Sequence, residues 1–332
     1  MPRLRLRRFA AASLAATALF AVTACSSSDD GDGVVASGDE TVKVGVLQFV
    51  QHPALDAATE GFKAALDEAG VQVEYDDQNA QGEVPNTNTI ATTFASDGLD
   101  LVFTVATPAA QAAAQAIVDT PVLFTAVTDA EAAGLVDSND APGANVTGTS
   151  DLNPVADQLA LLAEIAPDAK TVGVVYSSGE VNSEVQVDLA KEAAADLGIT
   201  IKEATVSNSS EVQQATQSLG DVDAIYVPTD NTVVSGIAAL IQVAEQKQIA
   251  VISGDSGPVE SGAVATIGID YTKLGYQTGE MAAKILQDGS DPASMPVETS
   301  NDVELIINPA GAERMGVELP DSVTERADTV IE

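Results

Sequence analysis

The stretch KVGVLQF (Lys43–Phe49) decides the fold, because a variant of it returns later in the chain as TVGVVYS (Thr171–Ser177). Two further segments recur in the same order. LDLVFTVATPA (99–109) is echoed by VDAIYVPTDNT (222–232), and TPVLFTAVTD (120–129) by IAVISGDSG (249–257). The spacing between partners is nearly constant, at roughly 125 positions, which indicates two similar lobes rather than one large domain.

Each recurring segment is a short β-branched run followed by an alanine-rich helical stretch. The first run, for example, precedes a predicted helix from about Pro53 to Ala69, with proline in its first turn and Gly70 as its cap. Strands that alternate with helices predict an α/β fold with two doubly wound parallel sheets.

The end of the chain predicts crossover strands between the lobes. After the second set of repeats, a strand and helix remain in 263–286 and a last strand in 303–311. We therefore expect lobe 1 to contain 41–149 plus about 264–298, and lobe 2 to contain 150–263 plus about 299–332. Two lobes joined by several strands form a hinge with a cleft between them.

The N-terminus predicts export. Four arginines within the first eight residues precede FAAASLAATALFAVTAC (9–25), whose end resembles the lipobox of bacterial lipoproteins. The apolar run falls short of the ~20 residues that a membrane span needs. We predict a signal peptide at 1–24, an acylated Cys25, a flexible acidic tether at 25–40, and a lipid-anchored protein on the extracytoplasmic face of the cell membrane.

Composition excludes several classes of function. The formal charge of −36 disfavours nucleic acid as a partner. Cys25 is the only cysteine, so the folded part has no disulfide, thiolate nucleophile or zinc–thiolate site. His52 is the only histidine, and no G-x-S-x-G, H-E-x-x-H or P-loop motif occurs. We predict no catalytic residue, no metal and no cofactor.

The ends of the predicted strands indicate the ligand site, because ligands of α/β sheets bind beyond the carboxyl ends of the strands. No lysine or arginine falls at such an end, so a phosphate ester or dicarboxylate is a poor ligand. A single carboxylate can be held at the start of a helix by backbone amides. The predicted helix that begins near Thr107 suits this, because Thr107 can cap it and Ala109 and Ala110 leave their amides accessible. An ammonium group then needs Asp230 or Asp255. These requirements describe an α-amino acid.

Two aromatic residues occupy matched positions at the first strand of each lobe. Phe49 and Tyr176 are placed to sandwich a flat ligand group, although both also suit a core. His52 precedes a proline at a helix start, and its sequence leaves open whether it contacts ligand or only caps the helix. The candidate ligand-binding residues are Gln48, Phe49, His52, Asn79, Ala106, Thr107, Pro108, Thr128, Tyr176, Asn182, Ser183, Thr229, Asp230, Asn231 and Asp255.

The chain resembles the substrate-binding lipoproteins of ABC transporters, in the subgroup associated with tryptophan and tyrosine uptake. The segments that carry the resemblance are VGVLQFVQHPALD (44–56), NAQG (79–82), ATPAAQAA (106–113), VLFTAVTD (122–129), NVTGTSDLNP (145–154), VDAIYVPTDNTVVS (222–235) and GIDYTKLGYQTG (268–279). The resemblance implies the type I periplasmic-binding-protein fold, an amino-acid ligand that is aromatic (tryptophan, tyrosine or phenylalanine), delivery to ABC permease subunits, and a monomer. The alternatives are a sugar or other small neutral solute, a ligand sensor, and an exported enzyme with paired carboxylates.

Overall fold

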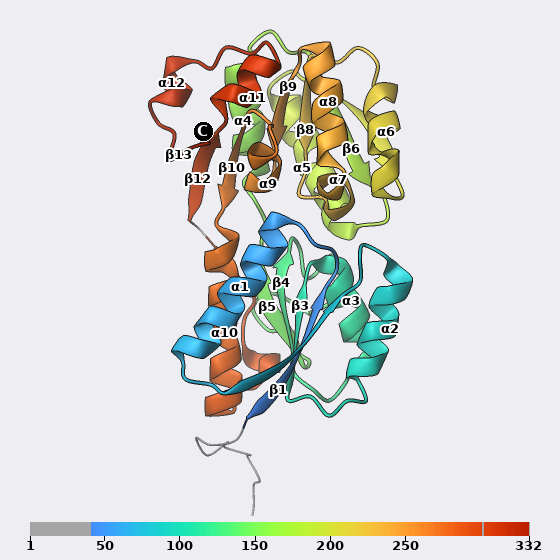
Figure 1. Ribbon diagram of the computed structural model, residues 1–332, viewed down its shortest axis with the longest axis vertical. Coiled ribbons are helices and arrows are strands. Elements are labelled where there is room, and N and C mark those ends of the chain that lie inside the picture. Colours follow the sequence, from blue (N-terminus) through green and yellow to red (C-terminus); the bar gives the residue numbers. More distant parts are fainter. Residues whose placement is uncertain (1–40, 301, 332) are drawn as a thin grey trace, which may run out of the picture. The chain divides into compact units, whose positions relative to one another are not determined.

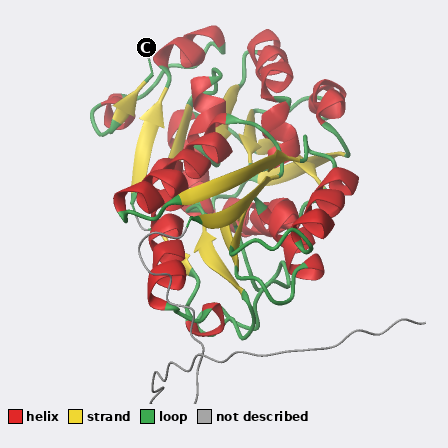
Figure 2. Cartoon of the chain, turned by 60° about the horizontal axis from the view of Figure 1, so that its bottom comes forward, coloured by secondary structure: helices red, strands yellow, loops and turns green. Residues whose placement is uncertain are grey.

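Two mainly parallel β-sheets with helices on both faces organise the chain (Figure 1), and Figure 2 shows the helices packed around the strands. The structure, a computed structural model, describes residues 41–300 and 302–331. The α/β fold class predicted from the sequence is confirmed.

The first lobe contains a six-stranded sheet of order β11-β5-β4-β3-β1-β2, in which all pairs are parallel. Its strands are β1 (Val42–Gln48), β2 (Val73–Asn79), β3 (Leu101–Val105), β4 (Val122–Val127), β5 (Val146–Ser150) and β11 (Glu298–Thr299). Its helices are α1 (Pro53–Glu68), α2 (Val84–Phe94), α3 (Thr107–Ala116) and α10 (Tyr271–Asp288), and a short 3₁₀ turn follows at Pro292–Ser294. The first repeat set therefore forms βα units.

The second lobe contains a seven-stranded sheet of order β13-β12-β10-β9-β8-β6-β7, in which only the β10–β12 pair is antiparallel. Its strands are β6 (Thr171–Ser177), β7 (Thr200–Val206), β8 (Ala224–Val227), β9 (Ala250–Ser253), β10 (Ala265–Ile269), β12 (Val303–Ile307) and β13 (Thr329–Val330). Its helices are α4 (Val155–Ile165), α5 (Val181–Asp196), α6 (Val212–Ser218), α7 (Asn231–Ser235), α8 (Ile237–Lys247), α9 (Ser256–Glu260), α11 (Pro309–Arg314) and α12 (Asp321–Thr324), with a 3₁₀ turn at Ser209–Glu211.

The chain passes between the lobes three times, after β5, after β10 and after β11. One boundary differs from the sequence prediction. We expected the return to lobe 1 at about residue 264, whereas β10 pairs with β9 and β12 in the second sheet. The return is made by α10, which packs beside α1 (Figure 1). Sheet membership depends on distant partners, which the strand's own residues do not reveal.

Glycines allow α1 and α10 to pack at short range. A Cβ atom on Gly275 would overlap the carbonyl oxygen of Ala58, and one on Gly61 would overlap that of Thr272. A Cβ on Gly279 would lie 2.6 Å from the carbonyl oxygen of Phe62. The backbones of the two helices therefore touch, and this contact ties the C-terminal part of the chain to the first lobe.

Each lobe has its own hydrophobic core. The first includes Phe62 and Phe103, whose rings stack with centroids 3.7 Å apart, together with Leu274 and Met281 of α10. The second includes side chains from β6, β8 and β9 and from the helices α4, α5, α6 and α8, and it buries Tyr226. Within 41–300 and 302–331, no helix is both long and apolar enough to cross a membrane. The predicted signal peptide, Cys25 and the tether lie outside the described residues.

Candidate functional site

A narrow cavity is lined by residues from both lobes, and we call it the interlobe cavity. Its lining consists of His52, Leu55, Ala126, Thr128, Asp151, Asn182, Thr229, Asp230, Asn231, Val234, Asp255 and Tyr271. Half of these residues directly follow the carboxyl ends of β4, β5, β8 and β9, where ligands of α/β sheets bind. None of the lining residues is a lysine or arginine, whereas three are aspartates.

Asp230 organises the second-lobe wall of this cavity. Its Oδ2 accepts hydrogen bonds from the Ser177 amide at 2.6 Å and the Ser183 hydroxyl at 2.7 Å, and its Oδ1 accepts from the Val233 amide at 2.7 Å. Burial, and the negative charge of Glu180, raise the pKa of Asp230, while its hydrogen bonds oppose that change. Both oxygens are engaged: Oδ1 caps the start of α7, and Oδ2 ties it to the end of β6 and to α5, so Asp230 is a structural residue.

Asp255 is the N-cap residue of α9, as Asp230 is of α7, but one of its carboxylate oxygens makes no hydrogen bond among the described residues. Its Oδ1 accepts from the Gly257 amide at 2.9 Å, and its Oδ2 is buried without a hydrogen-bond partner among the described residues. Burial first, and then the charges of Asp151 and Glu260, raise the pKa of Asp255 to about 7. An unpaired carboxylate oxygen in a cavity without cationic side chains has the chemistry to accept a hydrogen bond from a cation.

Asp151 and Tyr271 form the wall beside Asp255, and sequence reasoning missed both. Asp151 follows β5, where its Oδ1 accepts from the Thr128 hydroxyl at 3.0 Å and its Oδ2 from the Tyr271 hydroxyl at 2.8 Å. Burial raises the pKa of Asp151, against the effect of these two bonds. The available signal was a third aspartate directly after a predicted strand, in the segment that joins the lobes.

Glu180 is a second residue that the sequence analysis did not select. Only 4% of its surface is exposed, and its two oxygens accept from Asn182, Asn231 and Thr232. The shortest of these bonds is from Asn231 Nδ2, at 2.6 Å. Glu180 therefore fixes the side chains at the starts of α5 and α7. Its place in the turn after β6 gives no sign in the sequence that it becomes buried.

His52 lies on the first-lobe wall and faces Asn231, with its Nε2 at 3.4 Å from Asn231 Oδ1. Burial lowers the pKa of His52, although Asn231 and the charge of Asp56 act in the opposite direction. His52 is 9% exposed, and its Nδ1 has no partner among the described residues. His52 is the residue before α1 but makes no side-chain capping bond, and its imidazole lines the cavity instead.

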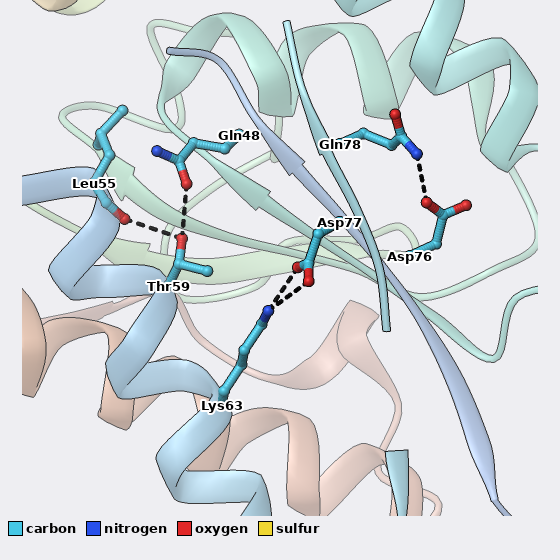
Figure 3. A network of polar contacts seen from close by, with 7 residues as sticks. All are labelled: Gln48, Leu55, Thr59, Lys63, Asp76, Asp77 and Gln78. Carbon is cyan, nitrogen blue, oxygen red and sulfur yellow. Dashed lines mark hydrogen bonds and ion pairs between the residues drawn. The ribbon is translucent and has the colours of Figure 1, made fainter. Parts of the chain in front are cut away.

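Other predicted residues lie outside the cavity lining. Gln48 is engaged within the first lobe, where it donates to Asp56 at 2.7 Å. It also accepts from the Thr59 hydroxyl at 3.1 Å (Figure 3). Asn79 is exposed and accepts from the Gln81 amide in its own turn. Figure 3 also shows Lys63 directed at Asp77, with Nζ–O distances of 2.6 and 2.8 Å, so this cation is paired on β2.

The proposed ring sandwich is not formed. Phe49 is 2% exposed and belongs to the first core, where it also borders a separate pocket with Gly82 and Asn208. The Tyr176 hydroxyl donates to Glu203 on β7 at 3.0 Å, and its half-buried ring packs on the second core. A position at a strand end did not determine the direction in which either ring points.

The start of α3 also differs from expectation. Ala106, not Thr107, precedes the helix, and the amides of Ala109 and Ala110 both donate to its carbonyl oxygen. Those amides are therefore not free for a carboxylate. The buried Thr107 hydroxyl has no partner among the described residues, while Pro108 occupies the first turn. Ala106 has φ of 82°, a conformation that strains a non-glycine residue and that concentrates at functional sites.

The buried carboxyls predict how stability depends on pH. The pKa of Asp255 is raised in the folded protein, so between about pH 4 and pH 7 the folded state binds more protons than the unfolded state. The free energy of unfolding therefore decreases as pH rises, by about 1.4 kcal/mol per pH unit for one such group. Urea unfolding of the ligand-free protein at pH 5 to 8 measures this slope. Asp255→Asn is expected to flatten it, and parallel profiles for the two proteins would contradict the assignment.

Comparisons with known proteins agree with this architecture. Residues 43–331 match the family model described as ABC transporter substrate binding protein. The chain is 42% identical to the tyrosine-binding protein of Clostridioides difficile over 296 residues, which cover 86% of each chain.

Two solved structures are similar over 88% of this chain. The ABC domain from Streptococcus pneumonia in complex with L-Trp has 37% identity, a TM-score of 0.85 and 100% of its own chain covered. The ligand-free, open structure of a substrate-binding protein with adhesive properties from Clostridium difficile has 47% identity, a TM-score of 0.67 and 99% of its own chain covered. The chain therefore belongs to the family of ABC transporter substrate-binding proteins and has the bilobal fold of periplasmic binding proteins.

Proposed function

We propose that this protein binds an aromatic amino acid, namely tryptophan, tyrosine or phenylalanine, in the interlobe cavity and delivers it to an ABC permease. The observation that carries the proposal is the buried, unpartnered Oδ2 of Asp255, in a cavity lined by no lysine or arginine. An ammonium group placed there neutralises the carboxylate and satisfies its oxygen. This arrangement suits a zwitterion better than an anion.

The likeness to known binding proteins supports the same ligand class. The relatives that the chain resembles at 37% and 42% identity are an L-Trp complex and a tyrosine-binding protein. The TM-score to the L-Trp complex, 0.85, is higher than the 0.67 to the open, ligand-free structure, although the open structure has the higher sequence identity, 47% against 37%. The bonds from Gln186 to Thr128 and between His52 and Asn231 join the two lobes, as expected when the cavity encloses a ligand.

The cavity favours binding without catalysis. Asp151 and Asp230 have both oxygens engaged in hydrogen bonds within the protein, and the described residues contain no group of three or more His, Cys, Asp or Glu suited to a metal. Enclosure of the ligand removes water and so gives tight binding without any chemical step. The protein is proposed to act as a monomer and a receptor, not as an enzyme.

Calorimetric titration of the purified protein tests the ligand class. We expect saturable binding of L-tyrosine, L-tryptophan or L-phenylalanine, with each recovered chemically unchanged, and no binding of ribose. Tight binding of ribose, or turnover of an amino acid, would contradict the proposal. Native mass spectrometry of the protein as purified provides an independent check, since a closed binding protein often retains its ligand.

The proposed place of action is the extracytoplasmic face of the membrane. The predicted signal peptide at 1–24 and the lipobox-like residues before Cys25 support a lipid anchor, and the acidic segment at 25–40 would tether the lobes to it. Mass spectrometry of the mature N-terminus is expected to find an acylated cysteine. A Cys25→Ser variant should leave the membrane fraction, and an unmodified Cys25 in membrane-bound wild-type protein would disprove the anchor.

A further inference from the structure

The orientation of Asn231 is fixed by its partners. Its Nδ2 donates to Glu180 Oε2 at 2.6 Å, and its backbone amide donates to the same oxygen at 3.3 Å. If the side-chain amide were reversed, its Oδ1 would face a carboxylate that can only accept, and the bond would be lost. Asn231 Oδ1 therefore faces His52 and needs a donor from it.

This requirement determines the tautomer of His52. Because Asn231 Oδ1 is an acceptor, His52 Nε2 must carry the hydrogen of the contact between them. Burial lowers the pKa of His52 and so keeps the ring neutral. In a neutral imidazole with its hydrogen on Nε2, Nδ1 is an acceptor. That atom is buried on the wall of the interlobe cavity and has no partner among the described residues.

The two ends of the cavity demand different ligand groups. At one end, Asp255 Oδ2 is unpartnered and, when ionised, favours a cation. At the other, His52 Nδ1 and Asn182 Oδ1 are neutral acceptors that require hydrogen-bond donors. In the second sheet, Asp255 follows β9 and Asn182 follows β6, which are separated by two strand spacings, or about 10 Å. In the first sheet, Asp151 follows β5 and His52 follows β1, three spacings apart.

We propose that His52 Nδ1 selects ligands by accepting a hydrogen bond from the ligand's side chain, so that the phenol of tyrosine or the indole of tryptophan is preferred to the ring of phenylalanine. The inference rests on the proposed function, since it assumes that the α-ammonium group occupies the Asp255 end. The distance between the two ends suits a molecule with an ammonium at one terminus and a donor at the other. A phenylalanine ring there would leave a buried acceptor unpaired.

Nitrogen NMR of the wild-type protein tests this directly, because His52 is the only histidine and its two ring nitrogens need no assignment among others. With ¹⁵N-labelled histidine, we expect the Nε2–H tautomer before ligand is added. Tyrosine or tryptophan should then shift the Nδ1 signal towards that of a hydrogen-bonded acceptor, and phenylalanine should not. An Nδ1–H tautomer, or equal shifts with all three ligands, would overturn the inference.

Affinities provide the second test. Phenylalanine should bind about 10- to 100-fold more weakly than the better of tyrosine and tryptophan. In His52→Leu this preference should fall to about three-fold or less, whereas Gln51→Ala, at the exposed neighbouring position, should retain it. If wild-type protein binds phenylalanine as tightly as the other two, the role of His52 is refuted while the proposed function stands. If none of the three binds, both are refuted.

Discussion

Asp255→Asn is expected to weaken binding of the amino-acid ligand by about 100- to 1,000-fold, because the ligand ammonium would be buried without a counter-charge. The substitution keeps the shape of the side chain and the acceptor for the Gly257 amide, so the fold should persist. Calorimetric titration near pH 8 measures the loss.

The same substitution should increase the free energy of unfolding of the ligand-free protein, although it weakens ligand binding. The pKa of Asp255 is raised to about 7 by burial, so ionised Asp255 destabilises the ligand-free protein at pH 8, and Asp255→Asn should unfold at higher urea concentration. Glu192→Gln is the control, since Glu192 is an exposed carboxylate on α5. It should change neither the ligand affinity nor the free energy of unfolding by much. If Asp255→Asn binds the ligand within about three-fold of wild type, Asp255 does not receive the ammonium.

Gly275→Ala should destabilise the protein by about 3 kcal/mol or more, or prevent folding, because the new methyl group overlaps the backbone of α1 at Ala58. Helix propensity alone predicts the reverse, a gain of about 1 kcal/mol for alanine over glycine. The two expectations therefore differ in sign. Urea unfolding of the ligand-free protein distinguishes them.

Gly179→Ala is the control for this substitution. A Cβ atom at Gly179 would meet only the Ser177 hydroxyl, at 3.8 Å, and its φ is not in the left-handed region. We expect a change within about 0.5 kcal/mol there. Unchanged or increased stability of Gly275→Ala would mean that α1 and α10 are not in backbone contact, and that the C-terminal helix is held to the first lobe by other means.

Much of the fold was predictable from local patterns. Hydrophobic runs, helix-start prolines and the repeated order gave the βα units and the two lobes. The assignment of β10 failed because its pairing with β9 and β12 is a long-range property. The packing of α10 was equally hidden, since Gly275 and Gly279 lie four residues apart on one face but their spacing does not show that α1 is the helix that packs against them.

The site was predictable in composition more than in detail. The sequence has no lysine or arginine at the predicted strand ends, and the interlobe cavity is indeed lined by neither residue type. The choice between Asp230 and Asp255 stayed open because both precede short helices and cap them. Only the hydrogen-bond partners distinguish them. Asp151 and Glu180 were missed because the sequence of a turn does not show which carboxylates become buried.

The most direct test of the account compares L-tyrosine with 3-(4-hydroxyphenyl)propanoate, which differs by loss of the ammonium group, in wild-type protein and in Asp255→Asn. Calorimetric titration should find the propanoate about 100-fold weaker or worse than tyrosine in wild type, and the difference should largely disappear in the variant. A propanoate that binds wild-type protein as tightly as tyrosine would contradict the central claim that a buried aspartate captures the ligand's positive charge.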